Sequence, residues 1–365
     1  MNFKPCMLFV LLLATLPCTA GTEFTGDNIN NIPVIRKLDV SDLAAGKIHR
    51  FFLQGAENGV GQHWLVPVLV AKGAKPGKRL GLQAGVHGDE LNGTRAIHQL
   101  FEQLDATQMS GSVIAVIGAN STGLLANSRY YQLQHDSGGG IDFNRIWPGK
   151  ENGNAAEQQV FRLFNGVWLG NVDAAIDLHT QSTGTAYPLY IYADYRVLGV
   201  REMAELIPAD IIKIDPGEPG AAEQAFNEAG IASITLEIGA PKSYQPELIS
   251  RSLIGINNIL KQYKILPGKI GLTAKKQGSF IGNETLSIRA QQGGFAEVLV
   301  SLKQTVKTGQ LLAVQRNGFG DIVARYNAPW DGRVASISTD PLREPGSMVV
   351  RLIRMNTEAS CKDGC

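Results

Sequence analysis

Two histidines and two glutamates stand where apolar, strand-like runs of the sequence end. His87 and Glu90 follow one such run and are three residues apart, so both side chains can point to one side at the start of a helix. His179 and Glu237 end two later runs. Two histidines and one glutamate form a common catalytic zinc site, and a second glutamate is a suitable general base. The residue types of His87, Glu90, His179 and Glu237 therefore favour a zinc site of two histidines and one glutamate, with a separate glutamate as the base.

Each of these residues also has a structural explanation when it is taken alone. A single His-x-x-Glu is more often the start of a capped helix, and a histidine at a strand end is more often bonded to a loop. A glutamate inside a sheet needs a partner, and a salt bridge would satisfy Glu237, because burying an unpaired carboxylate is costly. Asp177 lies two residues before His179 and is a candidate to fix the tautomer of that imidazole.

A second polar group surrounds residues 142–145, just after a glycine-rich stretch. It contains Asp142, Asn144 and Arg145, with Arg129 upstream. Arg145 can hold a carboxylate in a bidentate pair, and Asn144 can add a directional hydrogen bond. The segment is therefore a candidate binding surface, although a salt bridge within the loop would use the same residues.

The elements that position these residues alternate between strands and helices. Short β-prone apolar runs predict strands at 49–53, 64–70, 79–86, 113–117, 172–178 and 232–238. Helical spacing of apolar residues predicts helices at 90–104, 155–168 and 246–263. This alternation predicts a mostly parallel, helix-covered sheet, whose ligand sites tend to lie at the carboxyl ends of the strands. After residue 266 the pattern changes to short β runs separated by glycine, which predicts a 21–266 α/β domain and a 267–355 β-rich domain.

The composition limits the partners. The 365 residues carry a formal net charge of +1, so no basic field would attract nucleic acid, and we expect a small molecule or peptide as substrate. No oligomeric state is predicted.

Both ends of the chain have features of an exported protein. Residues 1–20 combine Lys4, a short apolar run and small residues before Gly21, which predicts a secretory signal peptide. The alternative is a membrane anchor, for which the apolar run falls short of about 20 residues. We expect a periplasmic or secreted protein with no stable membrane insertion after signal cleavage. Cys361 and Cys365 lie in the 356–365 tail and could close a small disulfide loop.

Five segments together resemble the succinylglutamate desuccinylase/aspartoacylase family, which is related to the zinc carboxypeptidases. They are GVHGDE (85–90), NSRY (127–130), DFNRIWPG (142–149), DLHT (177–180) and TLEIG (235–239). The resemblance spans about residues 50–355 and implies a zinc-carboxypeptidase-like α/β fold with a smaller, barrel-like all-β domain.

The resemblance also implies roles for individual residues. One zinc ion would lie on His87, Glu90 and His179, with Glu237 as general acid and base. Arg129 would lie near the scissile carbonyl, with Asp142 supporting the site. Asn144 and Arg145 would bind the carboxylate of the substrate's amino-acid part.

The implied activity is zinc-dependent hydrolysis of an amide bond, with metal-activated water removing an acyl group from an N-acyl amino acid. Family members that recognise acidic amino acids carry an additional cation before the catalytic glutamate, and residues 221–236 contain no Lys or Arg. This argues against N-acetylaspartate and N-succinylglutamate as substrates. Two alternatives are an exported zinc carboxypeptidase acting on short or cell-wall peptides, and a non-catalytic binding protein on the same fold.

Overall fold

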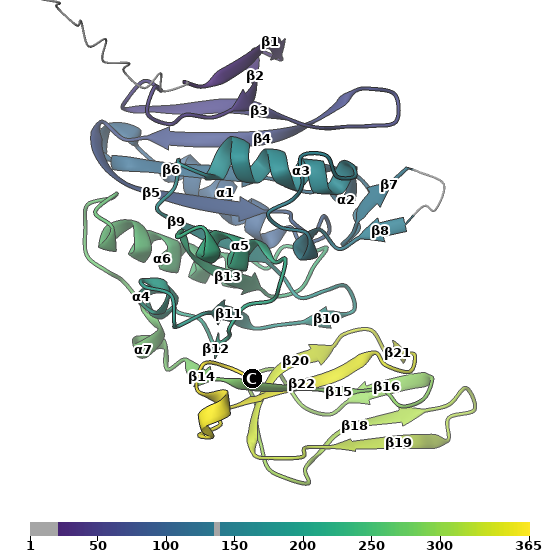
Figure 1. Cartoon of the computed structure of the whole chain (residues 1–365). Helices are drawn as coiled ribbons and strands as arrows, with labels where there is room; N and C mark the ends of the chain where they lie inside the picture. Colours follow the sequence, from purple (N-terminus) through teal and green to yellow (C-terminus); the bar gives the residue numbers. More distant parts are fainter. Residues whose placement is uncertain (1–20, 135–138) are drawn as a thin grey trace, which may run out of the picture.

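One large mixed sheet of eleven strands runs through the protein (Figure 1). The computed structural model describes residues 21–134 and 139–365, so the predicted signal peptide lies outside the described residues. The strands of the large sheet lie side by side in the order β1 (Glu23–Ile29), β2 (Ile32–Lys37), β3 (Lys47–Glu57), β4 (His63–Lys72), β6 (Ser110–Ile117), β5 (Lys75–Ala84), β9 (Ala174–His179), β13 (Ala232–Ile238), β11 (Leu189–Ala193), β12 (Ile211–Ile214) and β14 (Phe280–Gly282).

The centre of the sheet is parallel, because β6, β5, β9 and β13 all run in the same direction. β11 is antiparallel to β13, which makes the sheet mixed. The predicted fold class, a mostly parallel sheet flanked by helices with a smaller β-rich part, is confirmed.

Helices cover both faces of the sheet. On one face, α1 (Asn92–Gln103), α4 (Val200–Leu206) and α6 (Pro246–Gln262) pack against every second residue of the central strands. On the other face lie α3 (Ala155–Leu163), which continues as a π-helix over Phe164–Trp168, and α5 (Ala222–Glu228). Two short helices, α2 (Ser121–Leu125) and α7 (Ala274–Gln277), and a hairpin of β7 (Tyr131–Leu133) and β8 (Gly139–Ile141) complete this part.

The predicted helix at 90–104 begins later than expected. α1 starts at Asn92, so His87 and Glu90 lie in the turn between β5 and α1. The residues of this turn are buried at the edge of the sheet, so His87 and Glu90 are positioned by the turn and not by a helix.

The C-terminal part contains two small antiparallel sheets with their own apolar core. One sheet contains β10 (Thr185–Ala186), β20 (Gly332–Ser338), β22 (Met348–Arg354), β15 (Glu284–Arg289) and β17 (Thr305–Val306). The other contains β19 (Ile322–Asn327), β18 (Leu311–Arg316), β16 (Gly294–Val298) and β21 (Leu342–Arg343). β14 belongs to the large sheet, although it follows residue 266, where we placed the domain boundary.

The tail is fixed to the body of the protein. A disulfide joins Cys361 and Cys365, and the backbone of Cys365 bonds to Asn283 beside the start of β15. Among residues 21–134 and 139–365, no helix combines the length and the apolar character needed to cross a bilayer.

Candidate active site

The polar residues of the site come from alternate positions of neighbouring strands. In β9, Ile176 and Leu178 face the core under α1 and α6, so Asp177 and His179 face the opposite side. In β13, Leu236 and Ile238 face the same core, so Glu237 faces the side of His179, its partner in the strand register. The alternation places the chemically active side chains on one face of the sheet.

The three predicted metal ligands converge. The Nδ1 atoms of His87 and His179 lie 3.1 Å apart, and each is 2.9 Å from one carboxylate oxygen of Glu90. All three residues are at most 3% exposed. Burial opposes ionisation of Glu90, but the charges and hydrogen bonds of the two histidines outweigh it and hold the pKa of Glu90 well below its usual range.

A carboxylate stands behind each histidine. Asp142 Oδ1 lies 3.1 Å from His87 Nε2, and Asp177 Oδ2 lies 2.8 Å from His179 Nε2. A carboxylate only accepts hydrogen bonds, so each Nε2 carries a proton, and each Nδ1 can offer its lone pair to a metal ion that displaces the proton shared with Glu90. Two lone pairs and a carboxylate that face one another fit a divalent metal ion of the zinc type.

The tautomer of His179 is fixed from still deeper in the protein. Trp168 Nε1 donates to Gln83 Oε1 at 3.0 Å, and Gln83 Nε2 donates to Asp177 Oδ1 at 3.3 Å. An indole N–H can only donate, so Gln83 must use its N–H₂ group toward Asp177, and Asp177 accepts from Gln83 on one oxygen and from His179 on the other. Sequence reasoning missed Gln83 and Trp168; a glutamine inside the apolar run RLGLQAGV is the signal that could have indicated a buried partner.

Arg129 faces the ligand cluster. Its Nη1 donates to Glu90 Oε1 at 3.1 Å and to Ser182 Oγ at 3.0 Å, and its Nη2 donates to Asp142 Oδ2 at 3.2 Å. Ser182 was not predicted. The guanidinium lies where it can contact negative charge next to the three ligands.

Glu237 is a buried carboxyl group of the pocket. Among the described residues its Oε2 has no hydrogen bond and no ion pair is formed. Burial, reinforced by the carboxylates of Glu90 and Asp177, raises the pKa of Glu237 to about 8 in spite of His179 and Arg129. A carboxyl group with this pKa can both accept and deliver a proton near neutral pH.

Asn144 and Arg145 lie at the rim of the same pocket. Asn144 Oδ1 accepts from the backbone N–H of Ala222 at 2.9 Å, which leaves its amide N–H₂ for a ligand. The Arg145 guanidinium is half exposed and lies 3.8 Å from Glu218 at its nearest approach. This contact is long enough for a stronger anion to replace it.

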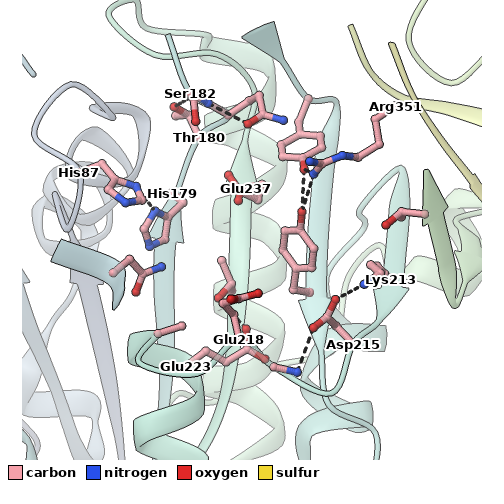
Figure 2. Close-up of a pocket in the computed structure, with 18 of the residues that line it drawn as sticks. His87, His179, Thr180, Ser182, Lys213, Asp215, Glu218, Glu223, Glu237 and Arg351 are labelled. Carbon is pink, nitrogen blue, oxygen red and sulfur yellow. Dashed lines mark hydrogen bonds and ion pairs between the residues drawn. The ribbon is translucent and has the colours of Figure 1, made fainter. Parts of the chain in front are cut away.

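The far wall of the pocket combines the α/β part with β22. Figure 2 shows His87 and His179 on one side, Glu237 in the middle, and Arg351 with the Lys213–Asp215 pair on the other side. Arg351 donates to the hydroxyls of Tyr187 and Tyr192 and, through Nε, to Ser287. The pocket has a volume of about 380 Å³, which suits a small molecule.

The predicted site residues therefore meet in one place. His87, Arg129, Asn144, Arg145, His179 and Glu237 line the pocket, and Glu90, Asp142 and Asp177 bond to them from behind. Their roles stay predictions. Sequence reasoning did not identify Ser182, Lys213, Tyr187, Tyr192 or Arg351, since their places depend on long-range packing.

Comparison with known proteins assigns the chain to a family. Residues 76–263, more than half of the chain, match the family model of the succinylglutamate desuccinylase/aspartoacylase catalytic domain. The chain belongs to this family. The N-alpha-acetyl-L-2,4-diaminobutyric acid deacetylase of Halomonas elongata is 26% identical over 286 residues, which are 74% of this family member and 80% of that relative.

Solved structures show the same family fold. The product-bound ectoine utilization protein EutE (DoeB) from Ruegeria pomeroyi superposes with a TM-score of 0.75 at 21% identity, over 86% of this chain and 98% of that one. A succinylglutamate desuccinylase/aspartoacylase from Rhodobacter sphaeroides superposes with a TM-score of 0.74 at 19% identity, over 87% of this chain and 98% of that one. The predicted family is confirmed, and with it the general class, an amide hydrolase of the deacylase type with a small-molecule substrate.

Proposed function

We propose that the protein is a zinc-dependent deacylase that hydrolyses the amide bond of an N-acyl amino acid. The observation that carries the proposal is the buried Glu237 carboxyl, which has no partner among the described residues, beside the convergent ligand atoms of His87, Glu90 and His179. When bound, zinc supplies Lewis acidity, which polarises the amide carbonyl and activates water.

Each residue has a defined task in this proposal. Glu237 takes a proton from the attacking water and delivers it to the nitrogen of the leaving amine. Arg129 stabilises negative charge that develops on the carbonyl oxygen, because its guanidinium already faces the ligand cluster. Asn144 and Arg145 hold the carboxylate of the amino-acid part. The products are a carboxylic acid and a free amino acid.

Two observations support an acyl amino acid in preference to a long peptide. The pocket of about 380 Å³ is walled by Ser287 and Arg351 of the β-rich part, which limits the length of chain beyond the scissile bond. The Halomonas relative is named for deacetylation of an N-acetyl amino acid, which is the same kind of bond.

A hydrolysis screen by mass spectrometry tests the proposal. The zinc-loaded protein is incubated with N-acetyl and longer N-acyl forms of neutral, basic and acidic amino acids, and with short peptides that have free C-termini. Cleavage confined to N-acyl amino acids is expected. Release of C-terminal residues from peptides would move the protein to the carboxypeptidases, and tight binding of an N-acyl amino acid without turnover would favour a binding protein.

We further propose that the deacylase acts outside the cytoplasm. The support is the signal-like sequence of residues 1–20 and the pair of cysteines that forms a disulfide. N-terminal sequencing of the protein from a cell fractionation should find Gly21 as the first residue in the exported fraction. An uncleaved cytoplasmic protein would contradict this.

A further inference from the structure

Glu223 is a buried carboxyl group of the pocket that the proposed reaction does not use. It is 5% exposed and lies below Glu237 in the view of Figure 2. Its Oε2 is bonded to Thr235 Oγ1 at 2.6 Å, while among the described residues its Oε1 has no partner. A buried oxygen without a partner is unfavourable, so a group of the bound ligand is a natural partner for it.

The charges around the pocket define the sign of that group. Asp215 is paired with Lys213, and Glu218 has Arg145 nearby. Glu223 forms no ion pair among the described residues. Burial, together with the carboxylates of Asp215, Asp177 and Asp194, raises the pKa of Glu223 well above its usual range. The surroundings of Glu223 therefore favour a positive ligand group over a negative one.

The position of Glu223 fits the side chain of an amino-acid substrate. Thr235, which holds Glu223, is two residues from Glu237 on the same side of β13, which is about 7 Å along the strand. The N–H of the preceding residue, Ala222, is bonded to Asn144. Glu223 is thus linked to the strand of the proton-transfer group through Thr235 and to the proposed carboxylate site through Ala222, and it lines the same pocket as both.

We propose that Glu223 determines specificity by accepting a hydrogen bond from a cationic amino group in the substrate's side chain. The inference rests on the proposed function and names its substrate class as N-α-acyl diamino acids. The ammonium donates to Oε1, and Thr235 continues to hold Oε2. No covalent change occurs at Glu223, which is a binding residue.

Arg351 offers the competing assignment, in which the pocket prefers an acidic side chain on the substrate. Its guanidinium has hydroxyl partners and no ion pair among the residues that the structure describes. An acidic side chain on the substrate would bind at Arg351, on the opposite wall from the histidines. A preference of the parent protein for acidic side chains, abolished by Arg351→Met, would overturn the assignment to Glu223.

The test compares side chains of similar size and different charge. N-α-acetyl derivatives of 2,4-diaminobutyrate, ornithine and lysine are measured beside those of norvaline, norleucine and glutamate, with the zinc-loaded parent and Glu223→Gln. A charge-assisted hydrogen bond predicts that the best diamino acid exceeds its neutral counterpart in kcat/KM by about 10-fold to 100-fold. Glu223→Gln should reduce that ratio to about 1, because the loss of kcat/KM should be larger for the diamino acid than for its neutral counterpart.

A matched control uses the same substitution on the same helix. Glu228 lies at the exposed end of α5, so Glu228→Gln should keep the preference for diamino acids. Zinc content and the melting curve of Glu223→Gln report whether the site is intact. An equal loss of kcat/KM for every substrate would assign Glu223 a structural role and overturn the proposal.

Calorimetry distinguishes failure of this inference from failure of the proposed reaction. If no compound is hydrolysed, but the parent binds N-α-acetyl-diaminobutyrate more tightly than N-acetyl-norvaline and Glu223→Gln does not, the deacylase activity is refuted and the cation site stands. If hydrolysis occurs and neither turnover nor binding distinguishes cationic from neutral side chains, the deacylase stands and the cation site is refuted.

Discussion

Replacing Asp177 by asparagine should weaken zinc binding through His179. Asp177 is fully buried and accepts from both His179 Nε2 and Gln83 Nε2. Asparagine has one acceptor oxygen and one N–H₂ group, so it can satisfy only one of these donors. Gln83 cannot turn its amide without losing the bond from Trp168, which donates only.

Either orientation of the new side chain carries a cost. If the oxygen of the new amide accepts from Gln83, its N–H₂ faces His179 Nε2 and favours the tautomer with the proton on Nδ1, the atom that faces Glu90. If that oxygen accepts from His179 Nε2, the N–H₂ group of the new asparagine faces the N–H₂ group of Gln83, and the hydrogen bond between these two side chains is lost. Loss of one hydrogen bond to a charged group costs about 1.5–3 kcal/mol. The expected rise in the zinc Kd is therefore about 10-fold to 100-fold.

Competition with a chromogenic chelator at fixed pH measures this Kd. Asp173→Asn is the matched control, because Asp173 precedes β9 and pairs with Arg79 away from the ligands. Circular dichroism of the metal-free proteins reports whether the fold is retained. A folded Asp177→Asn protein whose zinc Kd lies within about 3-fold of the parent would refute the idea that Asp177 orients His179.

Further perturbations test other parts of the site. Glu237→Gln should lower kcat by about 10²–10⁴-fold with zinc still bound, as single-turnover assays and metal analysis would measure; near-normal turnover would exclude Glu237 from proton transfer. Burial raises the pKa of Glu237 from 4.5 to about 8, so its ionisation opposes folding as pH rises through that window. Glu237→Gln should therefore stabilise the metal-free protein increasingly from pH 4.5 to about 8, and an unchanged difference in melting temperature would contradict this. Trp168→Phe should lower the free energy of unfolding in urea by about 1–3 kcal/mol, because Gln83 Oε1 loses its donor; an unchanged midpoint would show that the bond is dispensable. Replacing Cys361 and Cys365 by serine should accelerate hydrogen exchange at the amide of Thr285, which donates to Cys365 O, and leave distant strands unaffected.

The sequence was sufficient to predict six of the eleven strands of the large sheet, including its parallel centre, and the strand ends at which the site residues lie. The runs that end in His179 and Glu237 are mostly apolar because β9 and β13 are buried between two layers of helices. Parallel strands bring their carboxyl ends to one edge, so the polar residues that follow such runs are expected to meet. The structure places them there, within one pocket.

The far wall of the pocket could not be predicted in the same way. Arg351 reaches Tyr187 across 164 positions of sequence, and no local periodicity encodes that contact. Tyr192 belongs to the short strand β11, whose antiparallel pairing with β13 decides which face its side chain occupies. Glu223 was overlooked because one glutamate in the first turn of a short helix is ordinary until its burial is known.

Each of the two parts of the protein pairs a strand with the sheet of the other part, and this limits how the parts can be recombined by engineering. β10 leaves the α/β part to pair with β20, while β14 stays in the large sheet beside β12. Backbone hydrogen bonds between strands therefore connect the two parts at β10–β20 and at β12–β14. A hinge motion between the parts would have to break these hydrogen bonds. A β-rich part transplanted from a relative would therefore not dock as a separate cassette. A workable chimera must carry the matching Thr185–Ala186 and Phe280–Gly282 segments with it.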